Sequence, residues 1–133
     1  MLIGKALHAH LHKSANMTCE LSPYSCMPNT MSQGAMANVL GLHPDLLYAP
    51  IEIKGDAEVH ALSRCQMILT EAKKRSQSEF VEAMAKTGLT LEKIRQIEEK
   101  NPKVKKATYR IPHYGYASTA ANYALHLAGL RAN

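Results

Sequence analysis

The chain has 133 residues, a formal net charge of +5 and a hydrophobic fraction of 46%, which is ordinary for a globular protein of about one domain. Its apolar runs are all shorter than the ~20 residues of a membrane span. Residues 1–13 are too interrupted by histidine and lysine to be a signal peptide. We therefore expect a cytosolic protein. Its three cysteines form no CxxC pair, which argues against a disulfide framework and a closed structural zinc site.

A helix is expected over residues 2–14, because Ile3, Leu7 and Leu11 recur every four residues. His8 and His12 share another face of this helix at a spacing that can bind a metal. With no acid or cysteine beside them in the motif, a solvated face is the favoured interpretation.

Residues 17–21 are predicted to form a strand that Pro23 ends. The loop that follows, residues 22–29, has a proline on each side of Cys26. Thr30, with Gln33 three residues later, has the spacing of a capping box and predicts a helix start.

The helix that begins at Thr30 is expected to run to about Leu40, where Gly41 ends it with a left-handed cap. Its N-terminus would point back at the cysteine loop. Free N–H groups and the helix dipole favour negative charge there, such as a thiolate, a thiolate-bound cluster or a phosphate. The alternative is that Cys26 is a reduced, buried thiol in a rigid turn, and the residues leave both interpretations open.

Residues 46–53 are predicted to form the second strand, and Pro50 places it at a sheet edge because proline cannot donate to a ladder. Residues 54–56 form a tight loop in which Asp56 is a suitable N-cap for the next helix. The carboxyl ends of both strands should meet at one edge, where ligands bind in open α/β sheets. Glu52, Lys54 and Asp56 would then lie beside the cysteine loop.

The rest of the chain is expected to be helical, with helices over residues 57–75, 76–86, 91–99 and 117–130. The first should bury one stripe that makes Cys65 a small core residue, formed by Val59, Leu62, Cys65, Leu69 and Ala72. Ser76 with Glu79 predicts a new helix start, Gly88 a break and Thr90 a further cap. A basic and aromatic loop covers residues 103–116.

Basic residues gather at 73–75 and 100–110, at the ends of predicted helices where cations are favoured. The alternative is a surface for nucleic acid or for the phosphates of CoA. Nucleic acid is an unlikely partner, because the helix that would enter the groove carries Glu92, Glu98 and Glu99.

The alternation of helices and strands predicts an α/β fold with a small parallel sheet and helices on both faces. Residues 1–75 would form a βαβ-like core and residues 76–133 a helical extension, or the chain would be the C-terminal segment of a larger protein. Two strands are few for a sheet that usually has about four to six. We therefore expect the sheet to be incomplete until a partner chain, a second copy or an upstream domain supplies further strands.

Three segments resemble the C-terminal part of long proteins related to 2-hydroxyacyl-CoA dehydratases and their activases. They are S-P-Y-S-C-M-P-N-T at residues 22–30, Y-A-P-I-E-I-K-G-D-A-E-V-H-A-L-S-R at 48–64, and S-T-A-A-N-Y at 118–123. The resemblance spans nearly the whole chain in the same order, and the cysteine loop is its most specific part.

This resemblance implies an α/β iron–sulfur protein with an oxygen-sensitive [4Fe–4S] cluster, acting in low-potential electron transfer that an activase drives by ATP hydrolysis. It implies a cluster-ligand role for Cys26, with the helix at Thr30 stabilising the charge, whereas Cys19 and Cys65 match no family ligand. No Gly-rich phosphate loop is present, so we expect neither ATP binding nor catalysis by this chain alone. Further ligands would come from upstream of Met1 or from another chain.

The resemblance implies that the partner is the remaining part of the dehydratase or activase system, or a second copy of the chain. The alternative is a non-catalytic assembly module that completes a partner's sheet, with Cys26 in a structural role.

Overall fold

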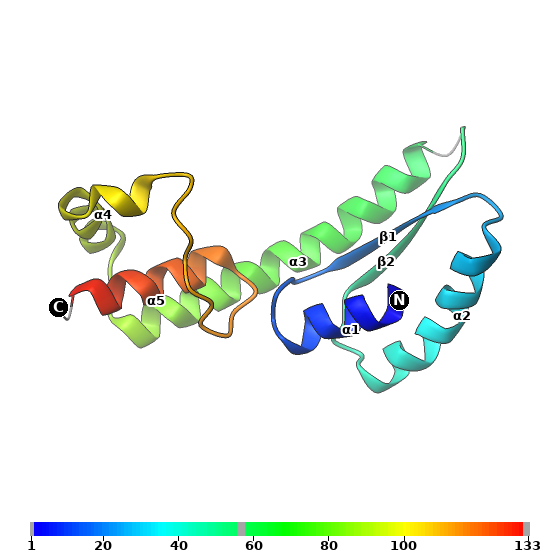
Figure 1. The fold of residues 1–133 in the computed structure, drawn as a ribbon, viewed down its shortest axis with the longest axis horizontal. Coiled ribbons are helices and arrows are strands. Elements are labelled where there is room, and N and C mark those ends of the chain that lie inside the picture. Colours follow the sequence, from blue (N-terminus) through cyan, green and yellow to red (C-terminus); the bar gives the residue numbers. More distant parts are fainter. Residues whose placement is uncertain (1, 56–57, 132–133) are drawn as a thin grey trace. The chain divides into compact units, whose positions relative to one another are not determined.

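The computed structural model describes residues 2–55 and 58–131 (Figure 1). Its elements are, in order, α1 (Leu2–Leu11), β1 (Thr18–Pro23), α2 (Met27–Leu42), β2 (Tyr48–Ile53), α3 (Glu58–Thr87), α4 (Leu91–Lys100), the 3-10 helix η1 (Pro102–Lys105) and α5 (Thr119–Arg131). The chain divides into two compact units, Met1–Lys74 and Arg75–Asn133, and α3 contributes residues to both. None of the helices within the described ranges is long and apolar enough to cross a membrane.

The first unit is built on a parallel pair of strands, which confirms the predicted α/β fold. β1 and β2 pair in a register that runs from Thr18 opposite Tyr48 to Pro23 opposite Ile53. Within the described residues the sheet has these two strands only, so both are edge strands. The prediction that Pro50 lies on an edge strand is therefore confirmed.

Helices cover both faces of this sheet. On one face, the carboxylate of Glu20 accepts a hydrogen bond from Ser32 of α2 and another from Tyr48 of β2. Successive side chains of a strand point to opposite faces, so Cys19 lies on the other face. There it interacts with Cys65 of α3.

The core of the first unit lies on the Glu20 face. Ala6 of α1, Met36 of α2 and Leu46, just before β2, are its buried residues, and Tyr48 packs against them. Side chains of α1 and α2 thus meet over the sheet. Met31 of α2 is 71% exposed and takes no part in this core.

Helix α2 is longer than predicted at both ends. It begins at Met27, not Thr30, because Pro28 occupies the first turn, where its fixed φ and missing N–H suit a helix start. The prediction that Gly41 ends the helix is also wrong, since α2 continues to Leu42 and His43 is the C-cap. Pro23 does not stop β1 but is its last residue.

Helix α3 is one helix of 30 residues where two were predicted. Ser76 does not cap a new helix, because its hydroxyl donates to the Ser118 hydroxyl at 3.0 Å. The basic run at residues 73–75 consequently lies inside α3 and not at a helix end. The predicted cap Asp56 lies outside the described residues.

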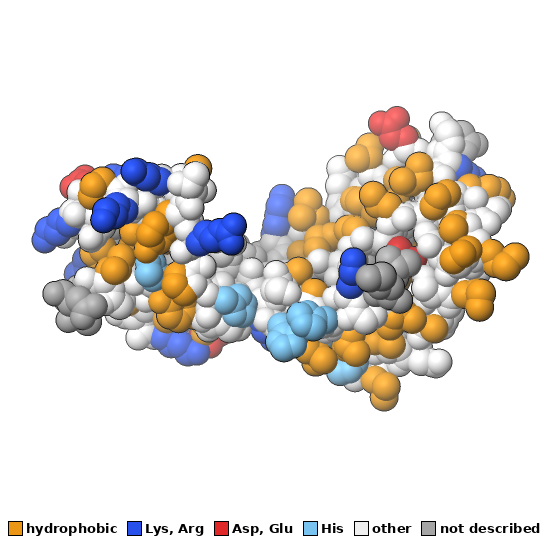
Figure 2. Space-filling view, viewed as in Figure 1, with side chains coloured by type: hydrophobic (Ala, Val, Ile, Leu, Met, Phe, Trp, Pro, Cys, Tyr) orange, Lys and Arg blue, Asp and Glu red, His pale blue; other side chains and the backbone are white. Residues whose placement is uncertain are grey.

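The expected core stripe of α3 is mostly on the surface. Val59, Leu62 and Leu69 are 77%, 52% and 42% exposed, whereas Ala72 is buried and Cys65 is half-buried. Figure 2 shows many hydrophobic side chains on the surface of the first unit.

The second unit packs α4, η1 and α5 with the C-terminal part of α3. Its larger core is formed by Leu89, Ile94, Val104 and Leu127. A second cluster of fully buried small residues, Ala83, Ala121 and Ala124, lets α3 and α5 approach closely. The predicted cap at Thr90 is confirmed, since its side chain accepts a hydrogen bond from the Lys93 N–H at 3.3 Å.

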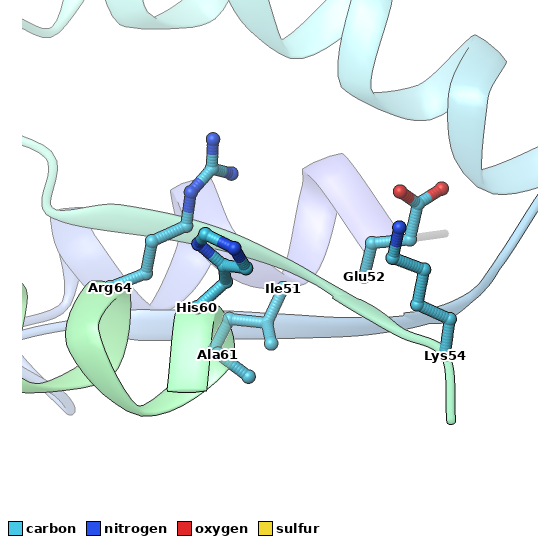
Figure 3. A pocket seen from close by; sticks show the side chains of 6 residues that line it. All are labelled: Ile51, Glu52, Lys54, His60, Ala61 and Arg64. Atoms are coloured by element: carbon cyan, nitrogen blue, oxygen red, sulfur yellow. The ribbon is translucent and has the colours of Figure 1, made fainter. Parts of the chain in front are cut away.

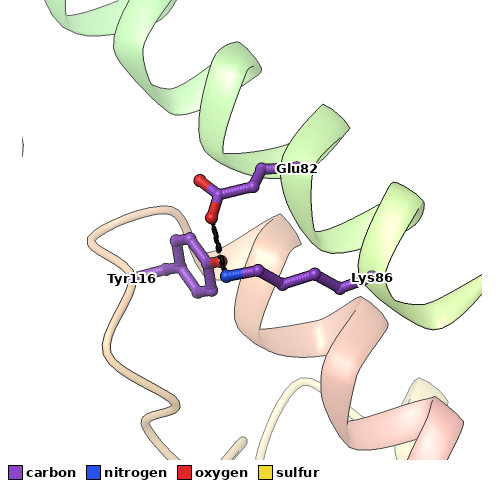
Figure 4. A network of polar contacts seen from close by, with 3 residues as sticks. All are labelled: Glu82, Lys86 and Tyr116. Carbon is purple, nitrogen blue, oxygen red and sulfur yellow. Dashed lines mark hydrogen bonds and ion pairs between the residues drawn. The ribbon is translucent and has the colours of Figure 1, made fainter.

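Side-chain hydrogen bonds hold the loop before α5. The Asn122 amide donates to the carbonyl oxygens of Tyr116 and Ser118, at 2.7 and 3.1 Å, and accepts from the Tyr114 N–H at 2.8 Å. On α3, Glu82 and Lys86 form an ion pair of 2.7 Å, and the Tyr116 hydroxyl bonds to both side chains (Figure 4). The hydrogen bond from Lys86, and after it the one from Tyr116, lower the pKa of the Glu82 carboxyl.

Candidate functional site at the carboxyl end of the sheet

Cys26 lies just beyond the carboxyl end of β1 and is the N-cap residue of α2. Its N–H donates to the Pro23 carbonyl at 3.2 Å, which closes a tight turn in which Ser25 has a φ of +59°. Both the main chain and the hydroxyl of Thr30 donate to the Cys26 carbonyl oxygen, at 3.0 and 3.1 Å. The backbone of the cysteine is therefore fixed by the helix it precedes.

The thiol of Cys26 is not used for this capping. The side chain makes no cap hydrogen bond, and it is a free, partly exposed cysteine. The first N–H groups of an α-helix have no partner within the helix, and they favour negative charge nearby. The arrangement suits a thiolate. Thr30 fixes the backbone and lies four residues beyond the N-cap, the position that the capping-box spacing predicted for it.

The other two cysteines form a separate pair. Cys19 lies within β1, on the face covered by α3, where Cys65 is its neighbour. Burial, and then the charge and hydrogen bond of Cys65, raise the pKa of the Cys19 thiol. Neither residue belongs to the turn that carries Cys26.

This arrangement fits one ligand position of an iron–sulfur cluster and not a whole cluster. Such clusters are generally held by four thiolates. In the part of the chain that the structure describes, no three His, Cys, Asp or Glu side chains converge as a metal site requires. Of the two residues predicted to serve the cluster, Cys26 stands at its predicted place between the strand and the helix, and Thr30 does not.

The second predicted loop lines a pocket of about 260 Å³. Glu52 and Lys54 lie at the end of β2, and His60, Ala61 and Arg64 face them from α3 (Figure 3). Glu52 and Lys54 were predicted to lie here, whereas His60 and Arg64 were not. Their spacing of four residues on a helix that follows a strand was the available signal.

The cysteine turn and this second loop are neighbours, as predicted. The Lys54 ammonium lies 5.6 Å from the centre of the ring of Tyr24, which is part of the cysteine turn. Asp56, the third residue predicted for this loop, lies outside the described residues.

The rings of His8, on α1, and His12, just after it, are exposed and tilted, with 4.2 Å between their centres. Within the described ranges no third His, Cys, Asp or Glu joins them to form a group that could hold a metal ion. His10 instead contacts Asp45, with 3.3 Å between Nε2 and the carboxylate, and so links α1 to the segment before β2.

Comparison of the chain with protein-family models, with curated proteins and with solved structures gave no significant match.

Proposed function

We propose that this chain is an accessory part of a cytosolic iron–sulfur protein of the dehydratase-activase type that its sequence resembles. In this proposal Cys26 supplies one thiolate to a [4Fe–4S] cluster, and another polypeptide supplies the remaining ligands. The chain would serve low-potential electron transfer without binding ATP or converting an acyl-CoA by itself.

The observation that supports this proposal is the position of the Cys26 sulfur. Cys26 lies at a helix N-terminus and at the carboxyl end of a parallel strand. Its backbone is held by hydrogen bonds, and its thiol makes no capping hydrogen bond. A negatively charged thiolate, alone or bound to iron, is stabilised by the helix N-terminus.

Anaerobic reconstitution with iron and sulfide tests the proposal. The sample is the chain co-expressed with the polypeptide that the neighbouring reading frame encodes. Bound iron and visible charge-transfer absorption are expected for the wild type and for Cys65→Ser, and both should be lost in Cys26→Ser. Cys65→Ser is the matched control, because it removes a thiol of the same chain that lies away from the turn. Equal iron in both variants would exclude Cys26 as a ligand.

A second candidate function is that of a non-catalytic assembly module, and the two edges of the sheet favour it. The Thr18 N–H donates to the Leu47 carbonyl and the Tyr24 N–H to the Ile53 carbonyl, at 2.9 and 3.1 Å. In a parallel ladder, backbone groups alternate between the partner strand and the outer edge. The residues between these ladder positions therefore direct their N–H and C=O groups outward.

The outer edge of β2 is obstructed. Pro50, at an outward position, has no N–H, and Arg64 Nη1 occupies its carbonyl oxygen at 3.2 Å. On β1 the outward positions are Cys19, Leu21 and Pro23. Pro23 ends the strand, has no N–H, and its carbonyl oxygen accepts from the Cys26 N–H, so the part of this edge that can pair is at Cys19 and Leu21, whose side chains are exposed, 62% in the case of Leu21. A further strand would therefore add at β1.

Sedimentation of the purified chain tests the addition of a second copy. Leu21→Lys places a charge on the β1 edge and should convert an oligomer to a monomer. Leu42→Lys, at the end of α2 and 79% exposed, is the matched control and should leave association unchanged. If both variants associate like the wild type, β1 is not the edge that pairs.

A further inference from the structure

The pocket beside β2 gathers basic side chains from two elements around a small apolar floor. Ile51 is buried, at 2% exposure, and with Ala61 it forms the apolar part. His60 and Arg64 lie on one side, and Lys54 lies with Glu52 on the other (Figure 3). Arg64 and Lys54 carry two positive charges against the single negative charge of Glu52, so the pocket favours an anion.

The donors of this pocket are positioned by the fold. Arg64 Nη1 donates to the Pro50 carbonyl at 3.2 Å, which holds the guanidinium at the edge of β2 and leaves its other N–H groups for a ligand. His60 precedes Arg64 by four residues, so both project from one face of α3. The Lys54 ammonium contacts the Tyr24 ring at 5.6 Å, which restrains it from the side of the first loop.

We propose that this pocket binds free hydrogenphosphate. Arg, Lys and imidazole N–H groups from two sides of the pocket match the several oxygens of a tetrahedral anion, and Arg pairs with phosphate by two parallel hydrogen bonds. The volume of about 260 Å³ exceeds that of one phosphate ion and leaves room for ordered waters, each of which occupies about 30 Å³. The carboxyl end of a parallel strand is also where ligands bind in open α/β sheets.

Glu52 decides which anion is selected. A carboxylate among the lining groups repels an anion that has no proton, and it accepts a hydrogen bond from one that has. Hydrogenphosphate carries an O–H at neutral and mildly alkaline pH. Sulfate has no proton there, and a phosphate monoester has lost its second proton above a pKa of about 6. The Glu52 carboxylate therefore favours free phosphate over both.

This inference does not depend on Cys26 or on iron. The residues that carry it lie on β2, directly after β2 and on α3, and none is among the proposed cluster ligands. The two proposals can fail separately.

Phosphate titration of the purified chain at pH 8, followed by calorimetry and by backbone amide shifts, tests the site. Millimolar binding is expected, with shifts at His60 and Arg64. Lys54→Gln and Arg64→Gln should each weaken binding about tenfold, since each removes one charge-assisted hydrogen bond. Lys74→Gln is the matched control, because Lys74 is an exposed lysine of α3 that does not line the pocket, and it should leave the affinity unchanged.

Sulfate and glycerol phosphate, titrated in the same way, test the role of Glu52. Both should bind at least about tenfold more weakly than phosphate, and Glu52→Gln should remove most of that difference. Absence of phosphate binding, or binding equally strong in Lys54→Gln, Arg64→Gln and Lys74→Gln, overturns the site. Tighter binding of glycerol phosphate or sulfate than of phosphate overturns the choice of ligand.

Discussion

Glu20 ties three elements of the first unit together, and removing one of its partners tests whether it does so energetically. Its carboxylate is 5% exposed and accepts hydrogen bonds from Tyr48 on β2 and Ser32 on α2, the latter at 3.1 Å. Tyr48→Phe removes one of these donors and keeps the ring that packs against the core. The carboxylate then remains buried with Ser32 as its remaining partner.

The expected loss of stability is about 2 kcal/mol, because hydrogen bonds to charged groups contribute roughly 1.5–3 kcal/mol and burial limits replacement by water. Amide hydrogen exchange of residues 18–23 and 48–53 measures this locally, and opening should become about 30-fold more frequent. Exchange in α4 and α5 should not change. A local readout is preferable to one melting temperature, because the chain consists of two units.

Tyr24→Phe is the matched control, since it also removes one phenolic hydroxyl from the first unit. Tyr24 is 63% exposed. Removal of its hydroxyl should therefore change the frequency of local opening by less than about threefold, which corresponds to roughly 0.5 kcal/mol. If Tyr48→Phe behaves like Tyr24→Phe, the Glu20 network contributes nothing beyond packing.

The same contact predicts an alkaline effect. Burial, and then the hydrogen bond and charge of Glu20, raise the pKa of the Tyr48 hydroxyl above its usual value of 10.0. The folded state thus holds this proton more tightly than the unfolded state. The stability it contributes is complete below pH 10 and declines as the pH rises toward the folded pKa. This decline should be smaller in Tyr48→Phe.

Three further predictions concern single groups. Burial, followed by the Glu98 hydrogen bond, raises the pKa of Tyr123 to about 12; the tyrosinate absorbance that Tyr123→Phe removes should therefore appear near that pH, and earlier titration contradicts the contact. The raised pKa of Cys19 predicts alkylation slower than that of a cysteine peptide at pH 8; mass spectrometry should find it faster in Cys65→Ser. Asn122→Ala should weaken the second unit by about 2–4 kcal/mol through three lost hydrogen bonds, whereas the exposed Asn38→Ala should cost less than 0.5 kcal/mol in urea unfolding.

Local signals predicted much of the fold. The Thr90 cap, the break at Gly88, which has a φ of +62°, and the two parallel strands are as predicted. Each depends on residues adjacent in the chain. Pro28 shows how two local signals compete, because a proline in the first turn starts α2 before the capping box of Thr30 is reached.

Contacts between distant residues explain what the sequence did not predict. Ser76 and Glu79 match a capping box, but both bond to Ser118, which lies 42 and 39 residues further along the chain. With those groups engaged, α3 continues without a break. The pocket was missed for a similar reason, because the edge of β2 that His60 and Arg64 face depends on how α3 returns along the sheet.

The position of Cys26 was predictable because it required only a strand end and a helix start. An incomplete sheet was predicted as well, but not which of its two strands offers the open edge. Cys26 follows β1, whose outward positions Cys19 and Leu21 lie before the proline that ends the strand. A polypeptide that adds a strand there would run beside the cysteine turn, and under the proposed function it would supply the remaining ligands of the cluster. Leu21→Lys should then lose both association and iron, whereas Cys26→Ser should lose iron and keep association. If a Leu21→Lys variant is monomeric and still binds iron, iron binding does not require a strand added at β1, and this prediction is wrong.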